Sequence, residues 1–292
     1  MQINANKIMV NYEAQGSGPW FTMIHGASNS LDVWSQQIEA FSLYFSTLTY
    51  DIRGHGKSGF GTKPVTADIL VDDLRSLFEA LGISSSIVLG HSMGAELAIR
   101  FYLKYPHMVD KLILCNSIMG VLLSEQELPR SRIDRCNNIM GGLLSEQELP
   151  QSGINREQGQ KDSPDSNLDR DSKIARYFSP GLAQSKPEVI ERFKEMLISS
   201  RNQRSQQGRL HPGGMVGELI HAPSGELRQI TCPTLIISGL NDTIVRPSAV
   251  EPIKKCFSNM QVKTIPAGHH SFIELPKQFN QTVLDFALSK DI

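Results

Sequence analysis

The stretch over residues 87–96 constrains the fold more than any other part of the chain. It begins as an apolar, β-branched run typical of a strand, continues as Gly-His-Ser-Met-Gly, and passes at once into a helical pattern. A serine on so sharp a strand-to-helix turn is held in a strained conformation that exposes its hydroxyl. Glycine two residues to each side lets strand and helix pass closely. The stretch predicts a nucleophile elbow at Ser92, the alternative being an ordinary turn with a buried serine.

The same alternation of strand and helix patterns continues along the chain. Strands are predicted over residues 20–24, 45–50, 109–115, 233–239 and 260–266, with an edge strand or hairpin over 3–14. Helices are predicted over residues 31–41, 66–81, 187–197 and 247–257, with a last one beginning near Pro276. This order is typical of the α/β class with a doubly wound, mostly parallel sheet.

The alternation stops between the strands at 109–115 and 233–239. We expect a core formed by residues 1–117 and 223–292, and a helical cap over residues 118–222 inserted between core strands. Such a cap lies over the carboxyl ends of the strands and sets substrate specificity. Within it, residues 119–129 recur almost unchanged as 140–150, and two copies are too few for a solenoid. The polar stretch at about 151–173 is expected to form a mobile loop.

Three chemically matched residues follow predicted strands in the order Ser92, Asp242, His269. A serine hydroxyl is a weak nucleophile at neutral pH, so an imidazole must accept its proton and later return it to the leaving group. A buried carboxylate fixes the tautomer of that imidazole and stabilises its cation. These residues are the predicted catalytic triad. His270 is the alternative base, and an acid after the strand at 109–115 is disfavoured because Asn-Ser stands there.

Backbone N–H groups near the elbow would stabilise a tetrahedral oxyanion. The N–H of Met93 begins the elbow helix, and that of Ala27 follows a His-Gly turn after the strand at 20–24. Strand-end placement makes His91, Met119 and Val245 candidates to line the substrate pocket. In the loop over 51–58, the Asp and the Arg are interpreted as structural braces.

Composition excludes several classes of function. The 292 residues carry a net charge of −1, which does not indicate a nucleic-acid or anionic-membrane surface. No apolar run approaches the roughly 20 residues of a membrane span, and the first residues lack the apolar core of a signal peptide. The four cysteines have no metal-binding spacing. We therefore expect a cytoplasmic protein without metal or other cofactor, and its oligomeric state stays open.

Together these motifs make the chain resemble the α/β-hydrolase superfamily over nearly its full length. The resemblance rests on His25-Gly26, the D-x-R-G-H-G-x-S loop at 51–58, the pentapeptide at 90–94, Gly239 to Asp242, and Gly268-His269. Its cap stretches at 132–133 and 177–180 and the helix from Pro187 are similar to those of 3-oxoadipate enol-lactonase-like proteins and small carboxylesterases. The resemblance implies a cofactor-independent serine esterase or lactonase acting on a small-molecule substrate through an acyl-enzyme.

Other members of the superfamily provide alternatives. Dehalogenases and epoxide hydrolases of this fold use an aspartate where this chain has Ser92, and C–C hydrolases commonly carry Trp where it has His270. A C–C hydrolase or lyase that uses the same triad stays open, as do haloperoxidase-like and hydroxynitrile-lyase-like members. So does a receptor that binds a small molecule without turnover.

Overall fold

The computed structural model describes residues 1–62, 65–117, 172, 174–205, 226–254 and 256–289. An eight-stranded sheet in the order β1-β2-β4-β3-β5-β6-β7-β8 runs through them. Its strands are β1 (Gln2–Ala5), β2 (Ile8–Gln15), β3 (Trp20–Ile24), β4 (Ser46–Tyr50), β5 (Ser86–His91), β6 (Val109–Cys115), β7 (Thr234–Gly239) and β8 (Met260–Ile265). Strands β1 and β2 form an antiparallel hairpin, β2 pairs antiparallel with β4, and every other pairing is parallel. The predicted mostly parallel sheet is confirmed.

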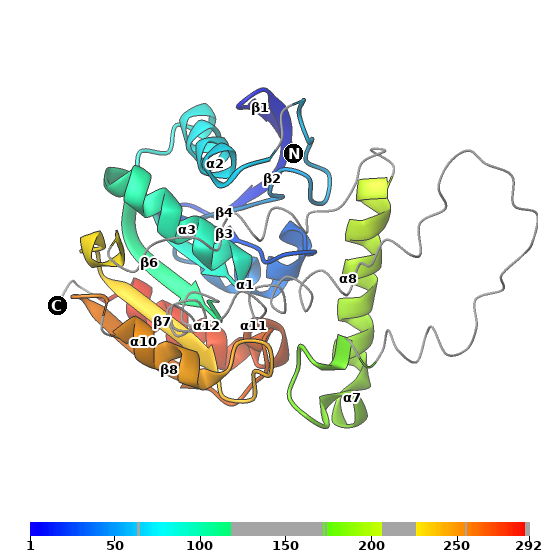
Figure 1. The fold of residues 1–292 in the computed structure, drawn as a ribbon. Coiled ribbons are helices and arrows are strands. Elements are labelled where there is room, and N and C mark those ends of the chain that lie inside the picture. Colours follow the sequence, from blue (N-terminus) through cyan, green and yellow to red (C-terminus); the bar gives the residue numbers. More distant parts are fainter. Residues whose placement is uncertain (63–64, 118–171, 173, 206–225, 255, 290–292) are drawn as a thin grey trace, which may run out of the picture.

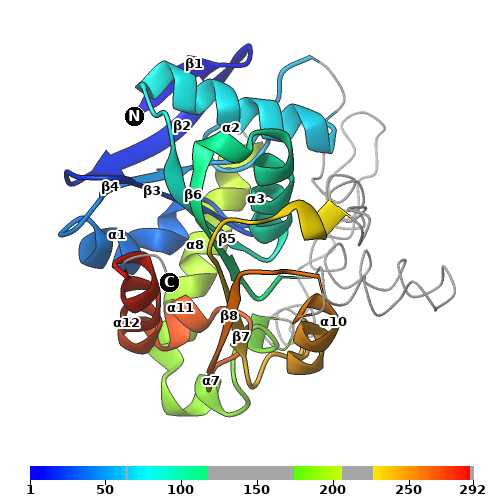
Figure 2. The ribbon, with the colours of Figure 1, turned by 90° about the vertical axis from the view of Figure 1, so that its left-hand side faces the viewer.

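Helices cover both faces of this sheet (Figures 1 and 2). The α-helices are α1 (Ser35–Phe41), α2 (Ala67–Leu81), α3 (Met93–Lys104), α7 (Leu182–Ser185), α8 (Pro187–Ser205), α10 (Val250–Lys254), α11 (Ser271–Glu274) and α12 (Pro276–Ala287). The 3₁₀ helices are η1 (Leu31–Trp34), η2 (Pro106–Met108), η6 (Glu226–Gln229) and η7 (Pro247–Ala249). Figure 2 shows α2, α3 and α10 on one side of the strands and α1, α11 and α12 on the other.

Alternating side chains of the central strands supply both halves of the core. In β5, Val88 packs with α2 and α3, whereas Ile87 and Leu89 pack with α1 and α12. Strand β6 divides in the same way, with Leu112 and Ile113 on opposite faces. A strand covered on both faces must be apolar throughout, which is why these runs lack polar alternation. In open α/β sheets covered on both faces, ligands bind at the carboxyl ends of the parallel strands.

Local capping signals correctly placed the helix predicted over residues 66–81. The Thr66 hydroxyl accepts a hydrogen bond from the N–H of Ile69, and Gly82 ends the helix in the left-handed conformation at φ 70°. A glycine adopts that conformation without the steric cost of a Cβ. Because both ends are chosen by nearby residues, α2 begins and ends as its sequence predicts.

Other boundaries differ from the predictions. The single helix expected over 31–41 is η1 followed by α1, and the one expected over 247–257 is η7 followed by an α10 that ends at Lys254. Helix α8 continues eight residues beyond the predicted Leu197, to Ser205. The short helix α11 was not predicted, because four residues carry no periodic pattern.

Between β6 and β7 the described residues contain α7, α8 and η6. Figure 1 shows α8 as a long helix beside the sheet. The repeat at 119–129 and 140–150, and nearly all of the polar stretch at 151–173, lie outside the described residues, so the division into core and cap stays a prediction. Within the described ranges, no helix is both long and apolar enough to cross a membrane.

Candidate active site

The turn between β5 and α3 has the strained geometry that its sequence predicts. Ser92 lies between the two elements at φ 52° and ψ −118°, a conformation that non-glycine residues rarely adopt. A Cβ at Gly90 would strike the carbonyl oxygen of Gly94, and one at Gly94 would strike the carbonyl oxygens of Ile24 and His25. The two glycines therefore permit the close approach of α3 to β5 and β3.

Ser92 is 2% exposed and lies at the N-terminus of α3. Its backbone N–H donates to the carbonyl oxygen of Cys115 at 2.9 Å, which fixes the turn to the end of β6. Within the described part of the chain, its Oγ atom has no hydrogen-bond partner. The first N–H groups of a helix have no partner inside the helix and carry partial positive charge, so this end of α3 favours developing negative charge.

A buried carboxylate and imidazole meet at the ends of β7 and β8. Nδ1 of His269 lies 2.8 Å from Oδ2 of Asp242, and the exposed fractions of the two side chains are 2% and 0%. The carboxylate accepts, so Nδ1 of His269 carries the hydrogen. In the neutral form of this ring, Nε2 is therefore the nitrogen that can accept a proton.

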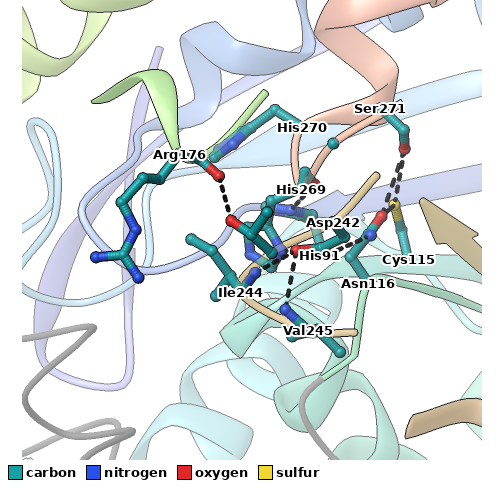
Figure 3. A network of polar contacts seen from close by, with 12 residues as sticks. His91, Cys115, Asn116, Arg176, Asp242, Ile244, Val245, His269, His270 and Ser271 are labelled. Atoms are coloured by element: carbon teal, nitrogen blue, oxygen red, sulfur yellow. Dashed lines mark hydrogen bonds and ion pairs between the residues drawn. The ribbon is translucent and has the colours of Figure 1, made fainter. Parts of the chain in front are cut away.

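Four donors surround the Asp242 carboxylate (Figure 3). Oδ2 also accepts from Nδ2 of Asn116 at 2.7 Å, and Oδ1 accepts from the N–H groups of Ile244 and Val245 at 2.8 and 2.9 Å. Burial raises the pKa of Asp242, but the positive charge of a protonated His269 and the hydrogen bonds from His269, Val245 and Ile244 outweigh it and hold the pKa below its usual value. The carboxylate therefore stays ionised near neutral pH.

His91, the neighbour of Ser92, bonds the backbone of His269. Its Nε2 donates to the His269 carbonyl oxygen at 2.9 Å, and its ring lies 4.8 Å from that of His269. Burial, aided by the charge of His269, lowers the pKa of His91 well below its usual value, so the ring is neutral. The residue next to Ser92 in the chain thus forms a hydrogen bond to the backbone of His269.

His270, the alternative base, occupies a different environment. It is 2% exposed, its ring packs 4.5 Å from that of Phe193, and its Nε2 lies 3.2 Å from Nδ2 of Asn29. Burial lowers its pKa well below the usual value, and the repulsion that a protonated His270 would meet from protonated His91 or His269 acts in the same direction. Of the two adjacent histidines, His269 is the one whose hydrogen bond to a carboxylate the structure records.

The loop after β3 lies beside this cluster. Ala27 is half-buried in it, and the next residue, Ser28, has a positive φ of 66°. The carbonyl oxygen of Asn29 accepts a hydrogen bond of 3.4 Å from Oγ of Ser200 on α8, which connects the loop to the inserted region. Of the two predicted oxyanion donors, Ala27 follows β3 and Met93 follows β5 and the elbow serine. Strands β3 and β5 are neighbours in the sheet.

The three predicted pocket residues have different outcomes. Val245 is buried and uses its N–H for Asp242, and His91 bonds His269, so both belong to the cluster. Whether they also contact substrate stays a prediction. Met119 lies outside the described residues.

The loop at 51–58 braces the structure. Oδ1 of Asp51 accepts from the N–H of Leu31 at 2.8 Å, and Oδ2 accepts at 2.8 Å from the N–H of Lys57. Arg53 donates two hydrogen bonds of 2.6 Å to Asp73 on α2, with both side chains nearly buried. Both residues therefore have structural partners.

Two functional candidates were not singled out in the sequence. Asn116 was noted only because it is not an acid, although its amide contacts Asp242. Glu274 accepts at Oε2 from the N–H groups of Gly268 and Ser179 at 2.9 and 3.0 Å. A glutamate in the first turn of α11, four residues after its N-cap residue His270, was the available signal. Among the described residues, no group of three or more His, Cys, Asp or Glu side chains is arranged to hold a metal ion.

Residues 19–276 match the family defined by the α/β-hydrolase fold. The match spans most of the sequence, and the strand order, the elbow at Ser92 and the buried Asp242–His269 pair accompany it. The chain is a member of the α/β-hydrolase fold family.

Several proteins similar to this chain are hydrolases. A 3-oxoadipate enol-lactonase from Acinetobacter baylyi is 23% identical over 283 residues, covering 96% of this chain and 94% of its own. The crystal structure of the enol-lactonase from Burkholderia xenovorans LB400 has a TM-score of 0.71 at 20% identity, over 99% of this chain and 100% of its own. A meta-cleavage product hydrolase from Pseudomonas fluorescens IP01 has a TM-score of 0.75 at 20% identity, over 98% and 97%. At these identities the two structures show a shared fold.

Proposed function

We propose that the protein is a serine hydrolase that cleaves a small carboxylic ester or lactone through an acyl-enzyme. The observation that carries this proposal is the buried 2.8 Å contact between Nδ1 of His269 and Oδ2 of Asp242, in a chain whose β5–α3 turn holds a serine at φ 52°. A structural histidine needs no ionised partner and no strained serine nearby. The full-length similarity to a 3-oxoadipate enol-lactonase supports the lactone side of the proposal.

In the proposed acylation step, Nε2 of His269 accepts the hydroxyl proton of Ser92 as Oγ attacks the carbonyl carbon. The ring becomes a cation, and the ionised Asp242 next to Nδ1 stabilises it. The N–H groups of Met93 and Ala27 donate to the oxyanion, each donor being typically worth about 3–4 kcal/mol. Nε2 then gives its proton to the leaving alkoxide as the carbon–oxygen bond breaks.

Deacylation repeats the sequence with water. His269 accepts a proton from the water molecule, the hydroxide adds to the acyl carbon, and the proton returns to Oγ of Ser92 as the acid product leaves. For a lactone, the alkoxide remains attached to the acyl group, so one ring-opened hydroxy acid leaves instead of two products. No step requires a metal or organic cofactor.

A fluorophosphonate probe tests the nucleophile directly. Intact mass should show one adduct on the wild type and none on Ser92→Ala, with Ser46→Ala, at the start of β4, as a control that keeps the adduct. An unlabelled, folded wild type would contradict the proposal and favour a binding protein. Steady-state assays on matched esters and lactones then identify the substrate class, and turnover of a vinylogous diketone alone would indicate a C–C hydrolase instead.

A further inference from the structure

We propose that the segment Arg176–Ser179, here called the clamp segment, holds the loops of Asp242 and His269 in register. Thr243 and Glu274 are its positioning residues. The inference rests on the proposed function of that pair. It follows from hydrogen bonds made by the neighbours of both residues to this one stretch of chain.

On the acid side, the two residues that flank Asp242 reach the clamp segment. Oγ1 of Thr243 donates to the carbonyl oxygen of Arg176 at 3.0 Å, a contact drawn in Figure 3 at Arg176. Nδ2 of Asn241 donates to Oγ of Ser179 at 2.9 Å. The loop after β7 is therefore fastened at both sides of the carboxylate.

On the base side, the two residues that flank His269 are fastened in the same way. The N–H of His270 donates to the carbonyl oxygen of Tyr177 at 3.1 Å. The N–H of Gly268 donates to Oε2 of Glu274, and the same oxygen accepts from the N–H of Ser179. Glu274 is 5% exposed, so its carboxylate is a buried bridge between the histidine loop and the clamp segment.

The clamp segment also packs against its neighbours. A Cβ at Gly268 would lie 2.5 Å from the carbonyl carbon of Phe178. The ring of Tyr177 lies 5.9 Å from that of His269, and the ring of Phe178 lies 5.2 Å from that of Phe193 on α8. The clamp segment therefore contacts the proposed base on one side and the inserted helices on the other.

This arrangement answers a mechanical problem of the site. Asp242 lies on the loop after β7 and His269 on the loop after the edge strand β8, and loops are more mobile than the strands they follow. A displacement of about 1 Å in a catalytic group can cost about 100-fold in rate. Because one segment bonds both loops, a shift of either loop relative to the other breaks hydrogen bonds.

The first test removes the acid-side contacts, which are exposed, and substitutions at exposed positions usually change stability little. In Asn241→Ala/Thr243→Val both side-chain donors are lost. Thr243→Ser keeps the hydroxyl and is the matched control. Thr282→Val removes a comparable 2.8 Å hydroxyl-to-carbonyl bond on α12, far along the chain from the clamp segment. Glu274→Gln replaces the charged acceptor on the base side with a neutral one.

Two readouts separate positioning from general stability. The downfield proton resonance of Nδ1–H of His269 reports the bond to Asp242, and the rate of fluorophosphonate labelling reports the activation of Ser92. In native samples matched by circular dichroism, the double variant should lose or broaden the resonance and label about 10- to 100-fold more slowly. Glu274→Gln should change both readouts in the same direction, and both controls should match the wild type.

An unchanged resonance in both the double variant and Glu274→Gln would overturn the proposal, even if labelling slows. A wild type that shows the resonance but no labelling would contradict the proposed function, and the resonance comparison would still decide whether the clamp segment positions the pair.

Discussion

Nε2 of His91 and the carbonyl oxygen of His269 are 2.9 Å apart, although 178 positions separate the two residues in the chain. The elbow strand thus holds the histidine loop by a side-chain hydrogen bond, independently of the loop's own carboxylate partner. In the neutral ring the other nitrogen, Nδ1, carries no hydrogen, and it lies 2.8 Å from where a Cβ on Gly26 would stand. The His91 imidazole therefore contacts both the histidine loop and the loop after β3.

Replacing His91 with Phe should keep most of the ring packing and remove the donor. The buried carbonyl of His269 would be left without its partner, so we expect the free energy of unfolding to fall by about 1–3 kcal/mol. Urea denaturation measures this loss. His107→Phe, in the exposed part of η2, should stay within about 0.5 kcal/mol of the wild type. Equal effects of the two substitutions would argue against the His91 hydrogen bond.

Asp242 should make stability depend on pH in a defined direction. Its pKa is lower in the folded protein than the roughly 3.9 of an unfolded chain, so it contributes stability above that value. The contribution is lost as pH falls through the folded pKa. Urea unfolding at pH 7, 5, 4 and 3 should show the wild type losing more stability below about pH 4 than Asp242→Asn. Parallel pH profiles would contradict this assignment.

The same substitution should reduce turnover sharply, because an asparagine can hold the ring in the wrong tautomer. A loss of about 10⁴-fold in kcat is expected for a triad of this kind. Steady-state kinetics on the substrate found in the ester and lactone assays measures it. Asp32→Asn, in η1, should leave kcat unchanged. A loss below about tenfold for Asp242→Asn would exclude a triad role.

Gly94→Ala tests the packing of the elbow. The new Cβ would lie 2.6 Å from the carbonyl oxygen of His25 and closer still to that of Ile24, and backbone atoms cannot move aside cheaply. We expect a loss of about 2 kcal/mol or more in the free energy of unfolding. Gly59→Ala is the control, since its Cβ would meet no atom closer than 3.5 Å. Calorimetry that finds both variants equally stable would disprove the close approach.

Two adjacent aspartates on α2 allow a buried ion pair to be compared with an exposed one, since Asp73 pairs with Arg53 and Asp72 with Lys104. Arg53→Met leaves the buried Asp73 without its two 2.6 Å donors, and should cost about 3–5 kcal/mol of unfolding free energy. Lys104→Met breaks the exposed 2.7 Å pair with Asp72 and should cost about 1 kcal/mol or less. Denaturant unfolding of both variants gives the comparison. Similar losses would mean that burial does not decide the energetics.

Residues close in sequence made much of the fold predictable. The β5–α3 turn, the parallel strands and the ends of α2 follow from apolar runs, glycines and one capping threonine. The split of residues 31–41 into η1 and α1 was not visible in the sequence. Val33 is buried in η1 and Ile38 in α1, and the spacing of these apolar residues also fits one continuous helix. The ends of α8 and α10 were likewise not predicted correctly from the apolar pattern.

The candidate site divides along similar lines. Chain order alone predicted that Asp242 and His269 would meet, since both follow neighbouring parallel strands. Asn116, Glu274 and Tyr177 were not assigned to the site, because their contacts join positions whose separation no local pattern encodes. A polar residue is recognised as a partner only when the fold has shown what it faces.

Gly268 carries a further lesson about why a residue type is required. It does not have a positive φ, so its backbone would accept other residues, and its small size is required only because Phe178 and Tyr177 pass directly over it. In homologues, the residue before the histidine should thus vary together with the path of the chain that enters α7, and not with the chemistry performed. A larger side chain at this position would mark, from sequence alone, a protein whose inserted region approaches the histidine differently.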